Sequence, residues 1–250
     1  MRKRTNFLSY PLLIMGLFLV FASSCEKDDD NPASDNQTNG KTTAVFNPAV
    51  TYGTMTDQNG NVYKTVTIGT QIWMAENLRT TKYNDGTSIP NITSYSVWDN
   101  LTTGAYCNYD NTSSNDTIAT FGRLYNWNAV NTGKLAPTGW HVPSDAEWTQ
   151  LSTYLGGESV AGDKLKETGT THWNSPNTNA TNKTGFTALP GGGRSSGGAF
   201  SGIGYAGYWW SSTAVSPGSA YCRAMDVSGS IVYRSYLGKN LGFSVRCVRD

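Results

Sequence analysis

A short helix with both of its ends encoded locally is the strongest structural signal in this chain. Residues 139–157 read GWHVPSDAEWTQLSTYLGG. Ser144 is a favoured N-cap residue and Glu147 follows three positions later, which is the capping-box pattern. The glycine pair at 156–157 supplies a stop, because glycine readily adopts the left-handed conformation that closes helices. The pattern therefore predicts a helix that begins after Ser144 and ends before the glycine pair.

The same stretch holds a histidine, carboxylates and tryptophans, so it also raises the question of an active site. Trp148, Leu151 and Leu155 recur at the spacing of one helix face, which assigns them to the core. Helix capping and core packing together explain most of the carboxylate and tryptophan side chains in this stretch. His141 has no such role, and we interpret it as a hydrogen-bonded packing residue beside Trp140 rather than as a ligand.

Composition indicates that the remainder of the chain consists mainly of short strands and loops. The 250 residues include 27 glycines, 12% are aromatic and 15% are charged. These proportions are typical of a loop-rich fold packed around aromatic side chains, and they exclude a helical bundle or a disordered chain. Lys and Arg number 19 against 18 Asp and Glu, so no global field recruits nucleic acid and we expect no nucleic-acid partner.

Strands are predicted early and late in the chain from β-branched and aromatic residues. Residues 62–68 and 71–74 are expected to pair as a hairpin around Gly69 and Thr70. Closing strands are predicted at residues 208–213, 220–235 (a hairpin that turns at Ser228 and Gly229) and 241–248.

Short helices and long loops are predicted between these strands. GRLYNWNAV, at residues 122–130, has helical spacing, and one helical turn is expected around residues 164–167. Residues 91–116 are rich in Asn, Ser, Thr and Asp and are expected to be irregular. Residues 185–207 hold so many glycines that we expect a broad loop rather than a continuous strand.

The N-terminal sequence predicts a lipoprotein signal peptide. Basic residues at 2–4 precede an apolar run at 11–22, which is shorter than the roughly 20 residues that a spanning helix needs. FASS before Cys25 resembles the lipobox of bacterial lipoproteins, with Ala22 in place of the usual leucine. We therefore expect residues 1–24 to be a signal peptide and Cys25 to be lipidated. Several acyl chains on one residue would give stable membrane anchoring.

The segment after Cys25 predicts a destination and a tether. CEKDDD resembles the acidic export signal that sends Bacteroidetes lipoproteins to the outer face of the outer membrane. Residues 25–50 are polar and nearly free of apolar periodicity, so we expect a flexible tether to a globular domain at 51–250. Asp116-Thr117-Ile118 matches the short O-glycosylation pattern of exported Bacteroidetes proteins, which makes Thr117 a candidate acceptor.

Three cysteines remain once Cys25 is assigned to lipidation. An exported protein lies in an oxidising compartment, where cysteine pairing is expected. Three pairings are arithmetically open among Cys107, Cys222 and Cys247. Our first choice is Cys222–Cys247, which would join two late strands and leave Cys107 as a small buried hydrophobe.

Five motifs in order resemble the Fibrobacter succinogenes major paralogous domain family. They are VTIGTQIWMAENL, GRLYNWNAV, GWHVPSDAEWTQL, GYWWSST and GFSVRCVRD. The resemblance runs from about Val62 to Asp250. That family occurs mainly in secreted proteins and lipoproteins of the Bacteroidetes and Fibrobacteres, and most members have no assigned activity.

A more distant similarity links GWHVPSDAEW and GFSVRCV to the formylglycine-generating enzymes, whose fold is a variant of the C-type lectin fold. It implies an α+β domain in which two helices pack beside a small antiparallel sheet, with long loops. Those enzymes bind copper through a late pair of cysteines. Cys222 and Cys247 do not lie in the enzymes' motif, so we do not carry the activity over.

Three further motifs match catalytic or ligand-binding patterns, but the sequence around each one lacks the residues or elements that the pattern requires. GRSSG at 193–197 lacks the later histidine of a nucleophile elbow, because His141 and His172 both precede it. GIGYAG at 202–207 leads into no helix that would hold phosphates. DNTSSND at 110–116 lacks the glycine and closing glutamate of a calcium loop. We therefore expect no enzyme, no cofactor and no transition-metal site, and weak calcium binding through Asn and Asp oxygens stays open.

The function expected from these observations is a surface-tethered binding module for a glycan or a protein partner. Candidate ligand-binding residues are Arg194, Tyr205 and Tyr208 in the glycine-rich segment, since glycines let neighbouring rings reach the surface. Alternatively, these aromatics fill the core. A structural component of a surface assembly and an enzyme related to the formylglycine-generating oxidases are the alternative functions.

Overall fold

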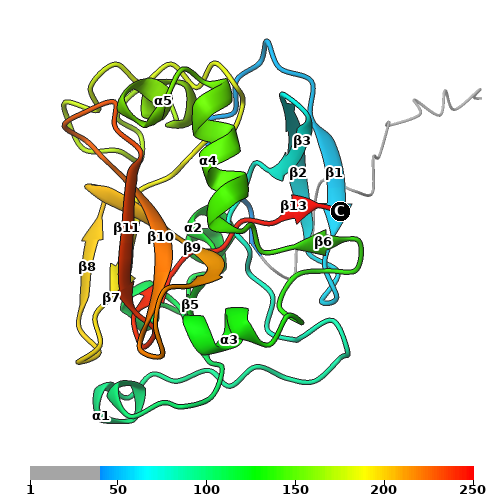
Figure 1. Cartoon of the computed structure of the whole chain (residues 1–250), viewed down its shortest axis with the longest axis vertical. Coiled ribbons are helices and arrows are strands. Elements are labelled where there is room, and N and C mark those ends of the chain that lie inside the picture. The colour runs from blue at the N-terminus through cyan, green and yellow to red at the C-terminus, as the bar shows by residue number, and fades with distance from the viewer. Residues whose placement is uncertain (1–39) are drawn as a thin grey trace, which may run out of the picture. The chain divides into compact units, whose positions relative to one another are not determined.

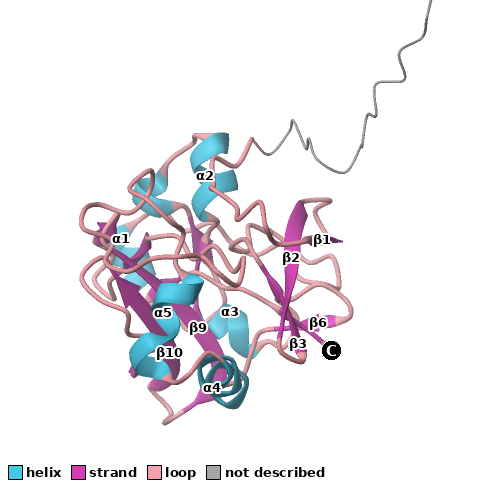
Figure 2. Ribbon diagram, turned by 90° about the horizontal axis from the view of Figure 1, so that it is seen from above, coloured by secondary structure: helices cyan, strands magenta, loops and turns pink. Residues whose placement is uncertain are grey.

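Sheets and loops dominate the computed structural model, which describes residues 40–250. The predicted signal peptide and Cys25 lie outside the described residues. Figures 1 and 2 show a mixed fold that is mainly β, with short helices and long connecting loops. Within residues 40–250, no helix has the length and apolar character needed to cross a membrane.

A five-stranded antiparallel sheet combines early, middle and late parts of the chain. Its spatial order is β1 (Gly53–Thr56), β2 (Val62–Ile68), β3 (Gln71–Met74), β13 (Val248–Arg249) and β6 (Trp140–His141). The predicted hairpin is confirmed, because β2 and β3 pair antiparallel around Gly69 and Thr70. The late strand β13 lies between β3 and β6, as Figure 1 shows.

The second sheet is larger and holds the predicted late hairpin. Its spatial order is β11 (Tyr233–Gly238), β10 (Ser219–Asp226), β9 (Ala206–Ala214), β7 (Gly191–Arg194), β12 (Gly242–Phe243), β5 (Leu124–Asn126) and β4 (Tyr106–Cys107), with β8 (Phe200–Ile203) paired to β7. Strands β10 and β11 pair antiparallel, which confirms the hairpin. The expectation of one small sheet is wrong, since the described residues form two sheets.

The helices are short and more numerous than predicted. The described residues contain α1 (Tyr95–Asp99), α2 (Asn115–Phe121), α3 (Trp127–Asn131), α4 (Asp145–Tyr154) and α5 (Glu158–Leu165), and a 3₁₀ turn at Tyr109–Asn111. The region 91–116, expected to be irregular, thus contains regular elements. The single turn expected near 164–167 is the end of the eight-residue helix α5.

Helix α4 confirms the capping-box prediction. The Ser144 hydroxyl accepts a hydrogen bond from the Glu147 amide at 3.3 Å, and the Glu147 carboxylate accepts one from the Ser144 amide at 2.7 Å. The helix buries Trp148, Leu151 and the capping residue Leu155. Both ends and the buried face were therefore readable from local sequence.

The motif GRLYNWNAV is not one helix. Leu124 lies in β5, and helix α3 begins only at Trp127. The Asn126 side chain accepts a hydrogen bond from the Ala129 amide at 3.1 Å, so it caps the helix at that point. The strand forms instead of a first helical turn because β5 pairs with β4 and β12.

One aromatic core joins α4 and α5 to both sheets. Trp148 of α4 packs against Trp73 of β3 with ring centroids 4.8 Å apart, and Phe186 contacts both rings. The same cluster includes Trp209 of β9. Figure 1 shows α4 running between the two sheets. Two further clusters of buried residues lie beneath the remaining strands.

The glycine-rich segment contains two strands, so its interpretation as a broad loop is wrong. Strands β7 and β8 pair antiparallel, and all four residues of β7 are buried. Gly192 has a φ of 62°, and an added Cβ would lie 2.5 Å from the Ser201 carbonyl oxygen. The glycines therefore permit close backbone packing inside the larger sheet.

The predicted closing strand at 241–248 is divided between the sheets. Strand β12 belongs to the larger sheet and β13 to the smaller one. Between them, Arg246 is fully buried and donates to Asn77 Oδ1 at 2.9 Å, to the Thr187 carbonyl at 2.8 Å and to the Phe186 carbonyl. These contacts hold the chain where it crosses from one sheet to the other.

The expected disulfide is not formed, because Cys107, Cys222 and Cys247 are free and buried. Cys222 and Cys247 belong to the same apolar core cluster. Cys247 lies in the crossing between the sheets rather than in a strand. Burial raises the pKa of the Cys222 thiol to about 12, and that of Cys107 to about 12 as well. Each therefore packs as a small protonated hydrophobe.

Residues 41–50, which the sequence places in the tether, contact the domain. The Lys41 amide donates to Asp116 Oδ1 at 2.8 Å. Asn47 donates from its side chain to the Asn182 carbonyl at 3.0 Å. Phe46 and Tyr52 pack edge to face with ring centroids 5.4 Å apart. Residues 41–50 therefore pack on the domain.

Candidate binding pocket

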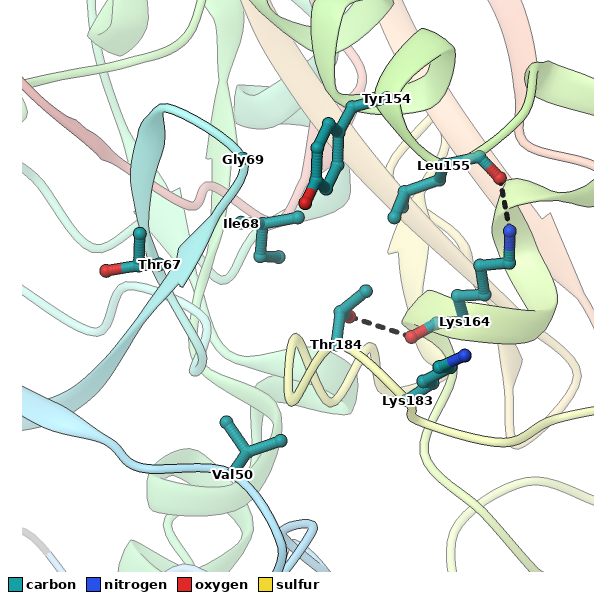
Figure 3. A pocket seen from close by; sticks show the side chains of 9 residues that line it. All are labelled: Val50, Thr67, Ile68, Gly69, Tyr154, Leu155, Lys164, Lys183 and Thr184. Carbon is teal, nitrogen blue, oxygen red and sulfur yellow. Dashed lines mark hydrogen bonds between the residues drawn. The ribbon is translucent and has the colours of Figure 1, made fainter.

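A pocket of about 390 Å³ opens beside the C-terminal end of α4. Four segments form it: the end of the predicted tether at Val50, the β2–β3 turn, the α4–α5 region and the loop before β7. The nine residues in Figure 3 line it: Val50, Thr67, Ile68, Gly69, Tyr154, Leu155, Lys164, Lys183 and Thr184. Its volume lies near the lower end of the range typical of small-molecule sites.

Tyr154 forms an exposed aromatic wall of this pocket. It is the last residue of α4 and remains 65% exposed, while Leu151 and Leu155 of the same region are buried. Three ring atoms of Tyr154 lie 3.1–3.3 Å from the position that a Cβ on Gly69 would occupy. Gly69 also has a φ of 63°, which favours glycine. A side chain at residue 69 would therefore require the Tyr154 ring or the turn to shift by a few tenths of an ångström.

Two lysines make the pocket positively charged. Lys164 of α5 donates from Nζ to the Leu155 carbonyl at 2.5 Å, and it thereby satisfies a free acceptor at the end of α4. Thr184 Oγ1 donates to the Lys164 carbonyl at 2.7 Å, which joins the next loop to α5. Lys183 is exposed, and its ammonium has no hydrogen-bond or ion-pair partner within residues 40–250.

The opposite side of the pocket is apolar. Ile68 is 4% exposed, and Val50 is partly buried against the same core. In the view of Figure 3, Ile68 and Gly69 lie on one side and the lysines on the other. None of the nine lining residues carries a carboxylate, an imidazole or a thiol. This arrangement suits binding of a ligand that has both an apolar face and negative charge.

The structure places the candidate ligand residue Arg194 inside the protein. Arg194 is 1% exposed and stacks on Trp98 with its guanidinium carbon 4.4 Å from the ring centre. It donates to the carbonyls of Ile92 at 2.5 Å, Thr93 at 3.0 Å and Gly198 at 2.9 Å. Its donors thus tie the β7–β8 loop to the segment before α1, and a ligand would not reach them without local opening.

Tyr205 and Tyr208 differ in exposure. Tyr205 is 59% exposed in the turn between β8 and β9. Tyr208 is partly buried and stacks on Phe243, with ring centroids 5.0 Å apart and planes 17° from parallel. Burial, then the neighbouring Asp226 carboxylate, raises the pKa of Tyr208. The three candidates therefore do not form one exposed surface, and a ligand role for Tyr205 stays a prediction.

Thr117 lies in the first turn of α2 rather than in a loop. Its amide donates to the Ser114 hydroxyl at 3.2 Å, and its own hydroxyl donates to the same oxygen at 3.0 Å. Its modification stays a prediction. Among residues 40–250, no group of three or more His, Cys, Asp or Glu side chains is arranged to hold a metal ion.

His141 lies between two carboxylates. Its Nε2 is 2.7 Å from Glu147 Oε1, and its Nδ1 is 2.6 Å from Asp250 Oδ1. Burial lowers the pKa of His141, but the hydrogen bonds to Asp250 and Glu147 outweigh burial, and the net pKa is raised. Both partners are carboxylates, which accept hydrogen bonds, so these contacts join His141 of β6 to α4 and to Asp250 and favour its protonated form. It is hydrogen-bonded, as interpreted from the sequence.

His172 binds the last part of the predicted tether. Its Nε2 is 2.9 Å from the Thr43 hydroxyl, and its Nδ1 is 2.8 Å from Glu167 Oε2. Hydroxyl, imidazole and carboxylate follow the same order in hydrolase triads. Here the Thr43 hydroxyl also lies 3.0 Å from that of Thr120, and the Glu167 carboxylate accepts from the Val45 amide at 2.6 Å. The group therefore holds this segment on the domain.

Tyr154, Lys164 and Lys183 were not among the residues selected from sequence. Tyr154 carried one usable signal, because an aromatic residue at the end of a helix and outside its apolar stripe is expected to be exposed. The lysines carried none, since single surface lysines are common. Only the folding of three distant segments beside α4 brings these residues together.

Comparison with known proteins identifies the family but no characterised relative. The Fibrobacter succinogenes major domain matches residues 66–249. No curated protein and no solved structure matches the chain. The matched region includes both sheets' central strands and helices α1 to α5. The chain therefore belongs to the Fibrobacter succinogenes major domain family.

Proposed function

We propose that this protein is a lipid-anchored binding module on the outer surface of the outer membrane, and that the pocket beside α4 is its ligand site. The N-terminal lipoprotein signal and the acidic residues after Cys25 support the location. The ligand proposed is a glycan, bound without catalysis and without a cofactor. The domain is proposed to be a variant of the C-type lectin fold, on the motif similarity described above.

The observation that carries the proposal is an exposed ring at the edge of an open pocket. A tyrosine with 65% exposure offers a flat apolar face and a phenol hydroxyl, which suits the C–H face and hydroxyls of a sugar. Thr67 and Thr184 add hydroxyl groups to the lining. The nine lining residues include no carboxylate–imidazole pair or thiol for covalent chemistry, which favours binding over catalysis.

A glycan array with the full-length, detergent-solubilised protein tests this function. Tyr154→Ala should weaken binding of any captured glycan several-fold, because losing a stacked ring costs about 0.5–1.5 kcal/mol. Tyr236→Ala is the matched control, since Tyr236 is 63% exposed and lies outside the pocket, and Tyr205→Ala tests the alternative site in the β8–β9 turn. Unchanged binding after treatment with EDTA is expected for a site without a metal.

Two results would contradict the assignment. Loss of binding in Tyr205→Ala with full binding in Tyr154→Ala would move the site to the β8–β9 turn. The second result is an array that captures no glycan, combined with a protein from cell-envelope extract that binds wild type and Tyr154→Ala equally. The partner would then be a protein that binds at another surface.

A further inference from the structure

Positive charge is concentrated on one side of the pocket and is not neutralised there. Two of the nine lining residues are lysines and none is acidic. Lys183 lines the pocket, is exposed and has no ion-pair partner among residues 40–250. By contrast, Lys134 is neutralised by Asp85 at 2.9 Å. The pocket thus keeps a cation available beside an apolar wall.

Lys164 adds a second, partly used ammonium. An ammonium group has three N–H donors, and the structure uses one of them on the Leu155 carbonyl. In the view of Figure 3, Lys164 and Lys183 lie on the same side of the cavity, across from Ile68. Two cations on one side attract an anion more strongly than either alone.

We propose that the pocket binds a sugar that carries a carboxylate, such as a terminal uronic acid. This inference rests on the proposed function and narrows its ligand class. A uronic acid combines an apolar ring face, which Tyr154 can cover, with one carboxylate, which Lys183 can pair. Pocket size agrees, because about 390 Å³ holds a ligand of one or two sugar rings and not an extended polymer surface.

Calorimetric titration of the full-length, detergent-solubilised protein tests the ligand class. The probes are a disaccharide ending in glucuronic acid and the otherwise identical disaccharide ending in glucose. We expect the acidic disaccharide to bind about five-fold more tightly, as one partly exposed ion pair supplies. Raising the salt concentration should reduce this preference, because salt screens exposed charges.

Variants of Lys183 show whether charge is responsible. Lys183→Gln should abolish most of the preference for the acidic disaccharide, whereas Lys183→Arg keeps the charge and should retain it. Lys82→Gln is the matched control, since Lys82 is an exposed lysine outside the pocket. Tyr154→Ala should weaken both disaccharides equally, because the ring contacts the sugar face and not the carboxylate.

The outcomes separate this inference from the proposed function. If the two disaccharides bind with equal affinity and Tyr154→Ala weakens both, the inference of an acidic ligand is wrong. The proposal of a glycan-binding module then still holds. Displacement of the uronate by an equal concentration of inorganic phosphate overturns it too, because the site would then accept any anion. Binding of neither disaccharide, combined with an empty glycan array, overturns both proposals.

Discussion

Gly69 controls the position of Tyr154 through the absence of a side chain. A Cβ at residue 69 would lie 3.1 Å from the nearest atom of the Tyr154 ring, at a φ of 63°. Such contact is tighter than ordinary van der Waals packing, so either the ring or the turn must shift. The position of the pocket wall therefore depends on the absence of a side chain at residue 69.

Gly69→Ala should destabilise the fold by about 1 kcal/mol or more and also weaken ligand binding. Gly86→Ala separates the two causes. Gly86 has a φ of 85°, but nothing lies within 4 Å of its Cβ position. It should lose similar stability, measured by urea unfolding, and keep full binding. Equal binding in both variants would show that Gly69 does not position the ring.

His141 predicts a pH-dependent contribution to stability. Its pKa is raised above the ordinary 6.5, so its stabilisation is present below the pKa of the unfolded chain and is lost as pH rises through the folded pKa. His141→Ala should cost up to about 1 kcal/mol near pH 6 and almost nothing near pH 9, since the pair is partly exposed. Unfolding by urea at both pH values measures this. A cost that is the same at both would contradict the charge-based account.

At the level of elements, helix α4 connects the core to the pocket. Its buried residues Trp148 and Leu151 face both sheets, and its last residue Tyr154 forms the pocket wall. The capping box at Ser144 fixes where the helix begins, and Lys164 satisfies a carbonyl where it ends. The position of Tyr154 thus follows from contacts at both ends of one helix.

Ser144→Ala should lower the free energy of unfolding by about 1 kcal/mol, because the Glu147 amide loses its acceptor. Ser144→Thr keeps a hydroxyl at the cap and should recover most of the loss. Chemical denaturation of the three proteins measures the difference. If Ser144→Ala and Ser144→Thr are equally destabilised, lost capping is not the cause.

At the scale of the whole molecule, buried cationic side chains donate hydrogen bonds to backbone carbonyls that receive none from helices or strands. Arg194, Arg246 and Lys166 are each buried and donate to backbone carbonyls of loops. Lys166 Nζ alone donates to the carbonyls of Thr178, Asp226 and Gly229 at 2.8–3.1 Å. Buried carbonyls require partners, and a loop-rich fold cannot supply them all from strands.

Arg194→Met should destabilise the domain by about 3 kcal/mol or more, because several buried carbonyls lose their donors. The folded fraction should bind the ligand as wild type does, since Arg194 lies outside the pocket. Urea unfolding and calorimetry at low temperature measure the two effects. Normal stability with lost binding would instead return Arg194 to the ligand site.

Cys25→Ser should abolish lipid attachment and release the protein from the membrane, because a hydroxyl does not replace the acylated sulfur. Metabolic labelling with a fatty-acid analogue and fractionation of the envelope measure this. Cys107→Ser serves as the control, since that buried cysteine has no role in attachment. Label that persists in Cys25→Ser would remove the lipoprotein assignment.

Local signals predicted the elements whose interactions lie close together in sequence. The α4 capping box joins residues three apart, and the β2–β3 hairpin closes over two residues. The ordered motifs likewise identified the family. These features were readable because each depends on neighbours along the chain, where spacing alone sets the geometry.

Tertiary structure alone decided the rest. Arg246 and its partner Asn77 are 169 residues apart, and their contact accompanies the division of the closing strand between two sheets. Arg194, an exposed-looking cation in a glycine-rich segment, became buried because distant carbonyls from 92–94 surround it. The sequence by itself determined the start of helix α4 and the two hairpins β2–β3 and β10–β11. Which residues line the pocket depended on which distant segments meet, and no local spacing encodes that.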